Sequence, residues 1–176
     1  MAIEVSKSMR YAATQVQTPL GTATVNRLAQ QPVLATILRA GLPMHQGVAD
    51  IFDRAEQAFV SACRNYTDET HSAFEIGIDA VSAPPLDGKV LVVCAPMLAT
   101  GASLAQVLTA LFASHGTPAT VHVLVAIASQ QGIDHVQSRH PQAHLWAGAV
   151  DAKLNDKGYI IPGLGDACDL AFGNKL

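Results

Sequence analysis

The sequence predicts one α/β domain built on a parallel, doubly wound sheet. Short apolar runs rich in β-branched residues alternate with helical patterns, and the clearest runs are Val33–Leu38, Val90–Cys94 and Thr120–Ser129. The chain has 176 residues, which is enough to bury a substantial core. It is 49% hydrophobic and only 14% charged, a composition that excludes a disordered segment.

Composition also narrows the classes of function. The formal net charge of −3 argues against sequence-independent binding to a nucleic-acid backbone. The three cysteines are scattered without metal-ligand spacing, so we expect reduced thiols and no protein-borne metal site. The N-terminus lacks the apolar core of a signal peptide, and no apolar run approaches the roughly 20 residues of a membrane helix. We therefore expect a soluble cytoplasmic protein without a membrane or nucleic-acid partner.

The domain, residues 1–176, divides into an arm over residues 1–31, an α/β core over 32–150 and a C-terminal segment over 151–176. In the arm, weak strand patterns over residues 11–16 and 22–26 flank a tight turn. Such a hairpin has little core of its own. We expect it to pack on the main body or on a second subunit.

The first strong strand pattern, Val33–Leu38, ends directly before Arg39. Ligands of open α/β sheets bind beyond the carboxyl ends of the strands, so Arg39 stands where a permanently charged anion clamp is useful. The alternative is a solvated arginine at a strand end. A helix is expected next, over residues 44–54, with Val48, Ile51 and Phe52 on its inner face.

A further strand is predicted over residues 59–63, with Arg64 just beyond its end. Residues 65–73 are polar and predict an exposed loop or hairpin, either a lid over an active site or a plain hairpin tip. His71 within it is more typical of a solvent-facing histidine than of a catalyst. The pattern Phe74–Ser82 predicts the next strand.

The stretch from residue 89 to 113 combines strand Val90–Cys94, a loop of small and hydroxyl residues and a helix from Leu104. This arrangement directs unpaired N–H groups and a positive dipole end toward a possible phosphate. Gly101 permits close approach of the backbone, and Thr100 and Ser103 can donate hydroxyl hydrogen bonds. An ordinary βα turn with Ser103 as helix cap fits the pattern equally well.

The pattern Thr120–Ser129 is the longest predicted strand and should be central in the sheet. His122 inside it is expected to be a satisfied core or interface histidine. A helix over Gln130–Arg139 and a last parallel strand over residues 145–150 follow.

Residues 158–169 are rich in glycine, proline and aspartate. Peptide groups in such a loop can recognise a small planar ring such as a pyrimidine through N–H and C=O groups. An irregular C-terminal cap over the sheet is the alternative.

Three motifs carry a resemblance to a known family. The segment Pro-Met-Leu-Ala-Thr-Gly-Ala-Ser, residues 96–103, resembles the phosphoribosyl-pyrophosphate loop of uracil phosphoribosyltransferases. Ile-Leu-Arg-Ala-Gly-Leu-Pro, residues 37–43, also matches that family. Tyr-Ile-Ile-Pro-Gly-Leu-Gly-Asp-Ala, residues 159–167, is a very specific signature of it, and residues 172–175 resemble its C-terminal tail. The motifs occur in the family's order and the resemblance covers nearly the whole chain, starting inside the family's N-terminal region.

The resemblance implies a type I phosphoribosyltransferase fold with a C-terminal hood-like loop and an N-terminal β-arm. It implies the reaction of uracil with phosphoribosyl pyrophosphate, carried with Mg²⁺, to give uridine monophosphate and pyrophosphate in pyrimidine salvage. It also implies a homodimer or higher homo-oligomer.

The family's site residues carry over by position. Arg39 and Arg64 would hold the pyrophosphate, and together with Asp166 they are the implied catalytic residues. Ile160, Gly165, Asp166 and Ala167 would read uracil, with Asp166 also reaching the phosphoribosyl substrate. The implied binding loop for the ribose 5-phosphate moiety consists of Ala95, Pro96, Met97, Leu98, Ala99, Thr100, Gly101, Ala102 and Ser103.

Four residues depart from the family pattern. Ala95 stands where the family has aspartate, and Ala102 and Cys168 stand where it has glycine. Leu170 replaces a basic residue. Loss of one charge-assisted contact at residue 95 would cost roughly 1.5–3 kcal/mol, about 10- to 150-fold. The alternatives are therefore a catalytically weakened protein of this fold that binds uracil or a nucleotide as a sensor, and a phosphoribosyltransferase for another base.

Overall fold

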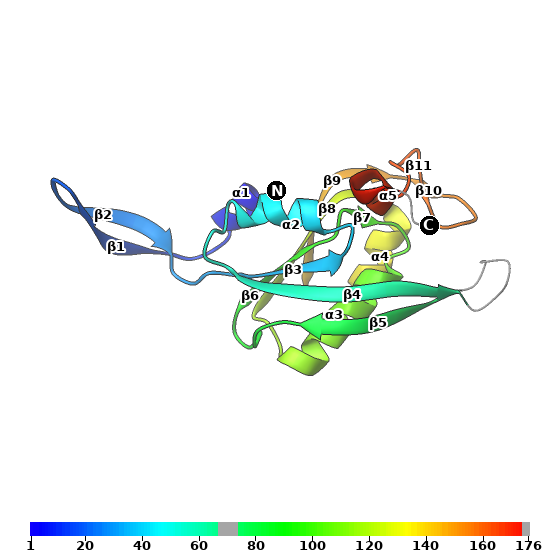
Figure 1. Ribbon diagram of the computed structural model, residues 1–176, viewed down its shortest axis with the longest axis horizontal. Helices are drawn as coiled ribbons and strands as arrows, with labels where there is room; N and C mark the ends of the chain where they lie inside the picture. The colour runs from blue at the N-terminus through cyan, green and yellow to red at the C-terminus, as the bar shows by residue number, and fades with distance from the viewer. Residues whose placement is uncertain (67–73, 174–176) are drawn as a thin grey trace.

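The computed structural model describes residues 1–66 and 74–173, and within these it leaves out the side chains of residues 63–66 and 74–75. Helices and strands alternate along the chain and assemble around one central sheet (Figure 1). The mixed α/β architecture with a mostly parallel sheet is confirmed.

The central sheet has the strand order β5-β4-β3-β6-β8, and β7 and β9 both pair with β8. All pairings are parallel except the one between β4 and β5, which is antiparallel. The antiparallel pair stands at one edge of an otherwise parallel sheet. The strands are β3 (Val33–Leu38), β4 (Glu56–Tyr66), β5 (Phe74–Ser82), β6 (Val90–Cys94), β7 (Met97–Leu98), β8 (Thr120–Ser129) and β9 (Ala143–Asp151).

Helices cover both faces of the sheet, as a doubly wound fold requires (Figure 1). One face packs against α3 (Ala102–His115) and α4 (Gln130–Arg139), and the other against α1 (Ala2–Lys7) and α2 (Leu42–Ala49). Neighbouring residues of β6 point to opposite faces of the sheet. Val93 belongs to the buried cluster that includes α3, and Val92 belongs to the buried cluster that includes α2. Both side chains are fully buried, so this strand is apolar on both faces.

The predicted N-terminal hairpin forms, and it projects from the body instead of packing on it (Figure 1). Its strands β1 (Tyr11–Thr18) and β2 (Gly21–Leu28) pair antiparallel over their whole length. Every residue of the two strands is exposed or half-buried. The hairpin leaves the body at the end opposite the C-terminal segment. Within one chain, the hairpin therefore lies away from the carboxyl ends of the parallel strands.

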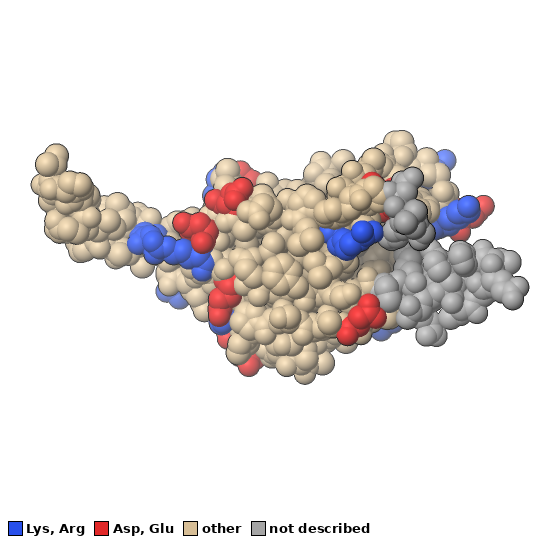
Figure 2. Space-filling view, in the orientation of Figure 1, with Lys and Arg blue, Asp and Glu red and all other residues tan. Residues whose placement is uncertain are grey.

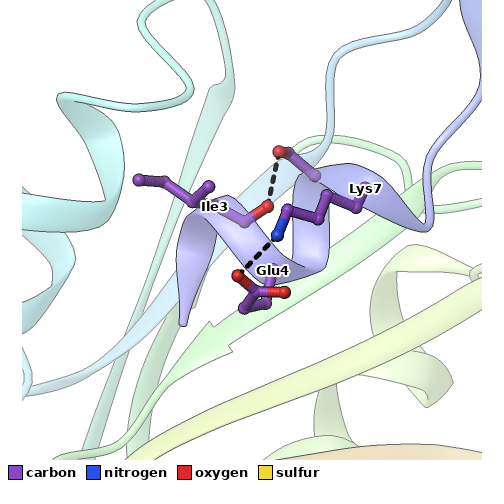
Figure 3. Close-up of polar contacts among 4 residues, drawn as sticks. Ile3, Glu4 and Lys7 are labelled. Atoms are coloured by element: carbon purple, nitrogen blue, oxygen red, sulfur yellow. Dashed lines mark hydrogen bonds and ion pairs between the residues drawn. The ribbon is translucent and has the colours of Figure 1, made fainter.

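Helix α1 precedes the hairpin and is stabilised locally. Ser6 Oγ donates to the Ile3 carbonyl at 2.7 Å, and Lys7 Nζ lies 2.8 Å from Glu4 Oε1 (Figure 3). The ion pair is exposed and contributes little. Ala2 and Val5 are buried in the core cluster on this face and attach the helix to the sheet.

The second helix differs from its prediction, which placed it over residues 44–54. It begins at Leu42, because Pro43 suits the first turn of a helix, and it ends at Ala49. Beyond it, the N–H groups of Ile51 and Phe52 both donate to the Val48 carbonyl. This tight turn buries Phe52 and leaves Ile51 44% exposed, so the inward placement of Ile51 was wrong.

Two further boundaries differ. Strand β4 runs from Glu56 through Tyr66, so Arg64 lies inside the strand instead of beyond its end, because antiparallel pairing with β5 extends the ladder. The predicted loop at residues 65–73 and His71 lie largely outside the described residues. Helix α3 begins at Ala102 instead of Leu104, which makes Ser103 its second residue. The alternative in which Ser103 caps this helix was therefore wrong.

The C-terminal segment is more regular than an irregular cap. It forms a short antiparallel pair, β10 (Lys153–Leu154) with β11 (Ile160–Ile161), followed by α5 (Ala167–Phe172). In Figure 1 this segment stands beyond β9 and α4. None of the helices in the part of the chain that the structure describes has the length and apolarity needed to span a bilayer.

Candidate active site

A cleft of about 620 Å³ opens at the carboxyl ends of β3 and β6, beside the middle of β4. Four segments far apart in the sequence form its walls. These are the end of β3 with the following turn, the middle of β4, the loop between β6 and α3, and the C-terminal segment. The described lining residues are Ile37, Leu38, Arg39, Ala40, Ser61, Ala62, Ala95, Pro96, Met97, Leu98, Ala99, Thr100, Gly101, Ser103, Leu104, Gly158, Tyr159, Ile160, Gly165, Asp166, Ala167 and Cys168.

The loop between β6 and α3 is held against β8 by backbone hydrogen bonds. Ala95 N–H donates to the Leu124 carbonyl at 3.0 Å, and the Pro96 carbonyl accepts from Ala126 and Ile127 N–H at 3.0 and 3.2 Å. Strand β7 then pairs with Ile127 and Ala128. The loop therefore extends the sheet, and its hydrogen bonds to β8 fix its position.

The N-terminus of α3 faces the cleft. Gly101 is its N-cap residue and has a φ of +80°, a left-handed conformation that favours glycine. Among the described residues, no side chain caps this end, although Ala102 N–H approaches Thr100 Oγ1 at 3.5 Å. The hydroxyl residues Thr100 and Ser103 line the cleft beside it. A 14-residue helix with uncapped N–H groups and two hydroxyls at its start suits an anion.

Arg39 is the only basic residue among the described residues that line the cleft. It follows β3 in a tight turn in which Gly41 N–H donates to the Ile37 carbonyl and Leu42 N–H to the Arg39 carbonyl. Gly41 leaves no room for a side chain, because a Cβ there would lie 2.1 Å from Thr36 Oγ1. The guanidinium of Arg39 therefore reaches the cleft from a closely packed turn.

The C-terminal wall is organised by three carboxylate or amide side chains. Asp166 caps α5, and its Oδ1 accepts from the N–H groups of Cys168 and Asp169 at 2.7 and 3.2 Å. Asp151 Oδ2, at the end of β9, accepts from Gly163 N–H at 3.0 Å. Asn155 Oδ1 accepts from the N–H groups of Lys157 and Tyr159 and closes the turn between β10 and β11.

The cleft brings together nearly all the residues singled out by sequence. Gly165, Asp166, Ala167 and the buried Ile160 face the loop of residues 95–103 and Arg39. Ala102 lies beside the cleft, in the first turn of α3, and is not among its lining residues. The side chain of Arg64 lies outside the described residues. The functional roles of these residues stay predictions.

Sequence reasoning missed Ser61 and Ala62 as lining residues, and it included Gly158, Tyr159 and Cys168 only as members of the loop over residues 158–169. Pairing of β4 with β3 places Ser61 opposite Leu38, and this neighbourhood is not evident from either strand alone. Cys168 was noted only as a departure from the family pattern. It is 8% exposed and belongs to α5, so a positive φ is not required at this position.

Two buried titratable groups, Cys94 and His45, are not among the described residues that line the cleft. Burial raises the pKa of the Cys94 thiol to about 12, which keeps it protonated and unreactive at neutral pH. Burial lowers the pKa of His45, and the Gln57 side chain and Ala35 backbone offset this effect in part. Neither group suits acid–base chemistry in the cleft.

No cluster of three or more metal-ligating side chains occurs among the described residues. Asp166 is the one carboxylate among the described residues that line the cleft. Because Ala95 is apolar and 4% exposed, the floor of the cleft offers no second carboxylate at that position.

Comparison with solved structures establishes the fold. An adenine phosphoribosyltransferase from Trypanosoma brucei shares the fold at 14% identity, with a TM-score of 0.54 over 79% of this chain and 62% of that chain. The fold, with its cleft at the carboxyl ends of the strands, is that of the type I phosphoribosyltransferases. A solved protein from Aquifex aeolicus is much more similar, with a TM-score of 0.87 and 34% identity over 98% of this chain and 80% of that chain.

Sequence comparison gives the family. The family model described as uracil phosphoribosyltransferase matches residues 1–174. A uracil phosphoribosyltransferase from Porphyromonas gingivalis is 45% identical over all of this chain and 81% of its own length. One from Methanothermobacter thermautotrophicus is 42% identical over 98% of this chain and 78% of its own length. The chain belongs to the uracil phosphoribosyltransferase family.

Proposed function

We propose that this protein transfers the phosphoribosyl group of phosphoribosyl pyrophosphate to uracil, yielding uridine monophosphate and pyrophosphate. One observation carries the proposal: the α3 anion site, Arg39 and the Gly165–Ala167 turn meet in a single cleft. Membership of the uracil phosphoribosyltransferase family supports the choice of substrates.

The 5-phosphate is assigned to the start of α3. N–H groups of the first helical turn and the hydroxyls of Thr100 and Ser103 supply donors without any basic side chain. Such a site holds a phosphate through many neutral donors and a dipole. It leaves the cationic Arg39 available for the second anionic group of the substrate.

The pyrophosphate is assigned to Arg39, joined by Arg64. A guanidinium can bind phosphate oxygens in bidentate fashion and remains charged at every physiological pH. Arg39 directly follows β3, and Arg64 lies in β4, the strand that pairs with β3.

Uracil is assigned to the C-terminal wall. Ile160 is buried and offers an apolar surface to a flat ring, while the turn at Gly165, Asp166 and Ala167 offers backbone polar groups. A pyrimidine ring presents an N–H flanked by two carbonyls, which backbone C=O and N–H groups can match. The free oxygen of the Asp166 carboxylate is assigned to the phosphoribosyl substrate.

The chemistry follows from this arrangement. The bond from the anomeric carbon to pyrophosphate breaks, a bond to uracil N1 forms, and the N1 proton is released. Positive charge develops on the sugar and negative charge on the leaving pyrophosphate. Arg39 and Arg64 stabilise the leaving group, and the walls of the cleft limit access of water to the sugar cation.

Mg²⁺ is proposed to enter with phosphoribosyl pyrophosphate as part of the bound substrate, where it neutralises phosphate charge. Asp166 is the carboxylate placed to meet that complex. Ala95 cannot contribute to it, so we expect a weaker hold on the ribose side than a carboxylate at that position would give.

We also propose a homodimer or higher homo-oligomer in which a second copy covers the hairpin. An isolated two-stranded hairpin is marginally stable in water, and this one has no buried residue along its described strands. From Tyr11 to Asn26 it carries no charged side chain, and Figure 2 shows its outer part free of charge. A cytoplasmic location is proposed as well, supported by the free thiols Cys94 and Cys168.

The proposal is tested by incubating the purified protein with uracil, phosphoribosyl pyrophosphate and Mg²⁺ and measuring uridine monophosphate and pyrophosphate in equal amounts. Adenine, guanine and cytosine serve as competing bases. We expect product with uracil only. Product with another base in place of uracil would refute the assignment of the C-terminal wall.

A further inference from the structure

The loop that carries Thr100 and Gly101 rests on the first turn of α4. Ser129, the last residue of β8 and the N-cap of α4, makes both connections with one hydroxyl. Its Oγ donates to the Ala99 carbonyl at 2.5 Å and accepts from Gly132 N–H at 2.9 Å. Ser129 is 1% exposed, so water cannot replace either bond.

Two glycines bring the same two segments into direct backbone contact. A Cβ on Gly132 would lie 2.3 Å from the Ala99 carbonyl oxygen and 2.8 Å from that of Leu98. A Cβ on Gly101 would lie 2.7 Å from the Gly132 carbonyl oxygen. The loop and α4 therefore interlock at both glycines, and neither segment has room to shift toward the other.

This contact lies just outside the cleft. Neither Ser129 nor Gly132 is among the described residues that line the cleft, whereas Ala99, Thr100 and Gly101 line it. The Ser129 bond fixes the peptide that immediately precedes Thr100. Any change in its orientation would change the direction of the Thr100 hydroxyl and of the first N–H groups of α3.

We propose that Ser129 and Gly132 are positioning residues for the anion site at the start of α3. Ser129 fixes the Ala99 carbonyl, Gly132 sets the distance of the loop from α4, and together they hold the phosphate donors in place before substrate arrives. The inference rests on the proposed function, because it takes the phosphate of phosphoribosyl pyrophosphate as the occupant. It assigns roles to two residues that do not touch the substrate.

The test compares Ser129→Ala, Ser129→Thr and Gly132→Ala with wild type in steady-state assays with each substrate varied in turn. Ser114→Ala is the matched control, because Ser114 Oγ donates to the Ala110 carbonyl on the exposed side of α3. We expect Ser129→Ala to raise KM for phosphoribosyl pyrophosphate about 5- to 30-fold, the effect of a lost buried hydroxyl with two bonds. KM for uracil should stay within about twofold, since its wall lies on the other side of the cleft. Ser129→Thr, which keeps the hydroxyl, should have a KM for phosphoribosyl pyrophosphate close to that of wild type.

Equal rises in both KM values, or a phosphoribosyl-pyrophosphate KM in Ser129→Ala equal to that of wild type, would overturn the inference while leaving the proposed function intact. Thermal melting of each variant separates misfolding from misplacement. If Gly132→Ala does not fold, the two Ser129 variants decide. If wild type itself forms no uridine monophosphate, the proposed function fails, and calorimetric titration with ribose 5-phosphate then tests the loop alone. In that case weaker binding to Ser129→Ala than to Ser114→Ala supports the inference, and equal binding refutes it.

Discussion

The guanidinium carbon of Arg39 lies 5.8 Å from the centre of the Phe172 ring. Arg39 follows β3 and lines the cleft, and Phe172 is the last residue of α5, so this contact joins the turn after β3 to the C-terminal segment. Phe172 is 44% exposed, so the contact is partly open to solvent. A cation over an aromatic face restrains the arginine without neutralising its charge.

Replacing Phe172 by leucine should therefore weaken binding of phosphoribosyl pyrophosphate modestly. An exposed cation–π contact contributes about 0.5–1 kcal/mol, which corresponds to a rise in KM of about two- to fivefold. Phe172→Tyr keeps the ring face and should behave as wild type. An unchanged KM in Phe172→Leu would show that Arg39 is oriented by other contacts.

Substitution of Gly41 should also displace Arg39, because both residues belong to the tight turn after β3. In Gly41→Ala the new methyl would meet Thr36 Oγ1, Ile37 O and Cys94 O, all within 3.0 Å. We expect the free energy of unfolding to fall by about 1–3 kcal/mol. We also expect the folded variant to be less active than folded wild type, because the turn that carries Arg39 is displaced. Urea unfolding and initial rates measure the two effects.

Gly47, inside the following helix α2, provides the matched control. A Cβ there meets nothing within 4 Å, so Gly47→Ala should stabilise the protein by about 0.5–1 kcal/mol. Comparable destabilisation by both substitutions would contradict the view that the turn before α2 is the constrained site.

Asp166 has two roles that substitution can separate. Its Oδ1 caps α5, and its charge is assigned to the substrate. Asp166→Asn keeps an accepting oxygen at the N-cap, so stability should change little while activity falls at least tenfold. Asp166→Ala should lose both the helix cap and the charge, so activity should fall and the free energy of unfolding should decrease by about 0.5–2 kcal/mol. Full activity in Asp166→Asn would show that the negative charge of Asp166 is not required for the reaction.

The stability of the protein should fall as pH decreases below about 6.5. Burial lowers the pKa of His45 below the ordinary value of 6.5. Burial, together with the charge of nearby His144, also lowers the pKa of His122. His122 Nδ1 accepts a hydrogen bond from Trp146 Nε1 at 3.1 Å, which requires that nitrogen to be unprotonated. The unfolded chain therefore binds more protons than the folded chain below pH 6.5, and unfolding becomes more favourable.

Urea unfolding between pH 7.5 and 5 tests this dependence. Substituting both residues, His45→Gln with His122→Gln, should flatten the decline between about pH 6.5 and 5 while lowering stability at pH 7.5. A slope unchanged by the double substitution would assign the decline to other groups.

Much of the fold was predictable because the core strands are continuous apolar runs. The bounds of β6, β8 and α4 agree with their predictions, since apolar periodicity decides them locally. Ile51 and the start of α3 were mispredicted, because a backbone turn at Val48 and the geometry of Gly101 decide these places. Neither leaves a periodic signal in the sequence.

The site was predictable in part for a different reason. Arg39 and the loop before α3 follow strand patterns, so the rule for carboxyl strand ends locates them. The contacts of Ser129 with Ala99, and of Arg39 with Phe172, join segments that no local pattern relates. Such contacts depend on sheet order and loop packing, which only the structure supplies.

Formation of uridine monophosphate from uracil, phosphoribosyl pyrophosphate and Mg²⁺ tests the central claim most directly, measured for wild type beside Arg39→Ala and Ala95→Asp. The account predicts turnover by wild type, a loss of at least tenfold in Arg39→Ala, and destabilisation of the ligand-free Ala95→Asp protein, whose carboxylate would be buried. A folded wild-type protein that forms no product, while Ala95→Asp does, would contradict it and identify a site that binds its substrates without reaction.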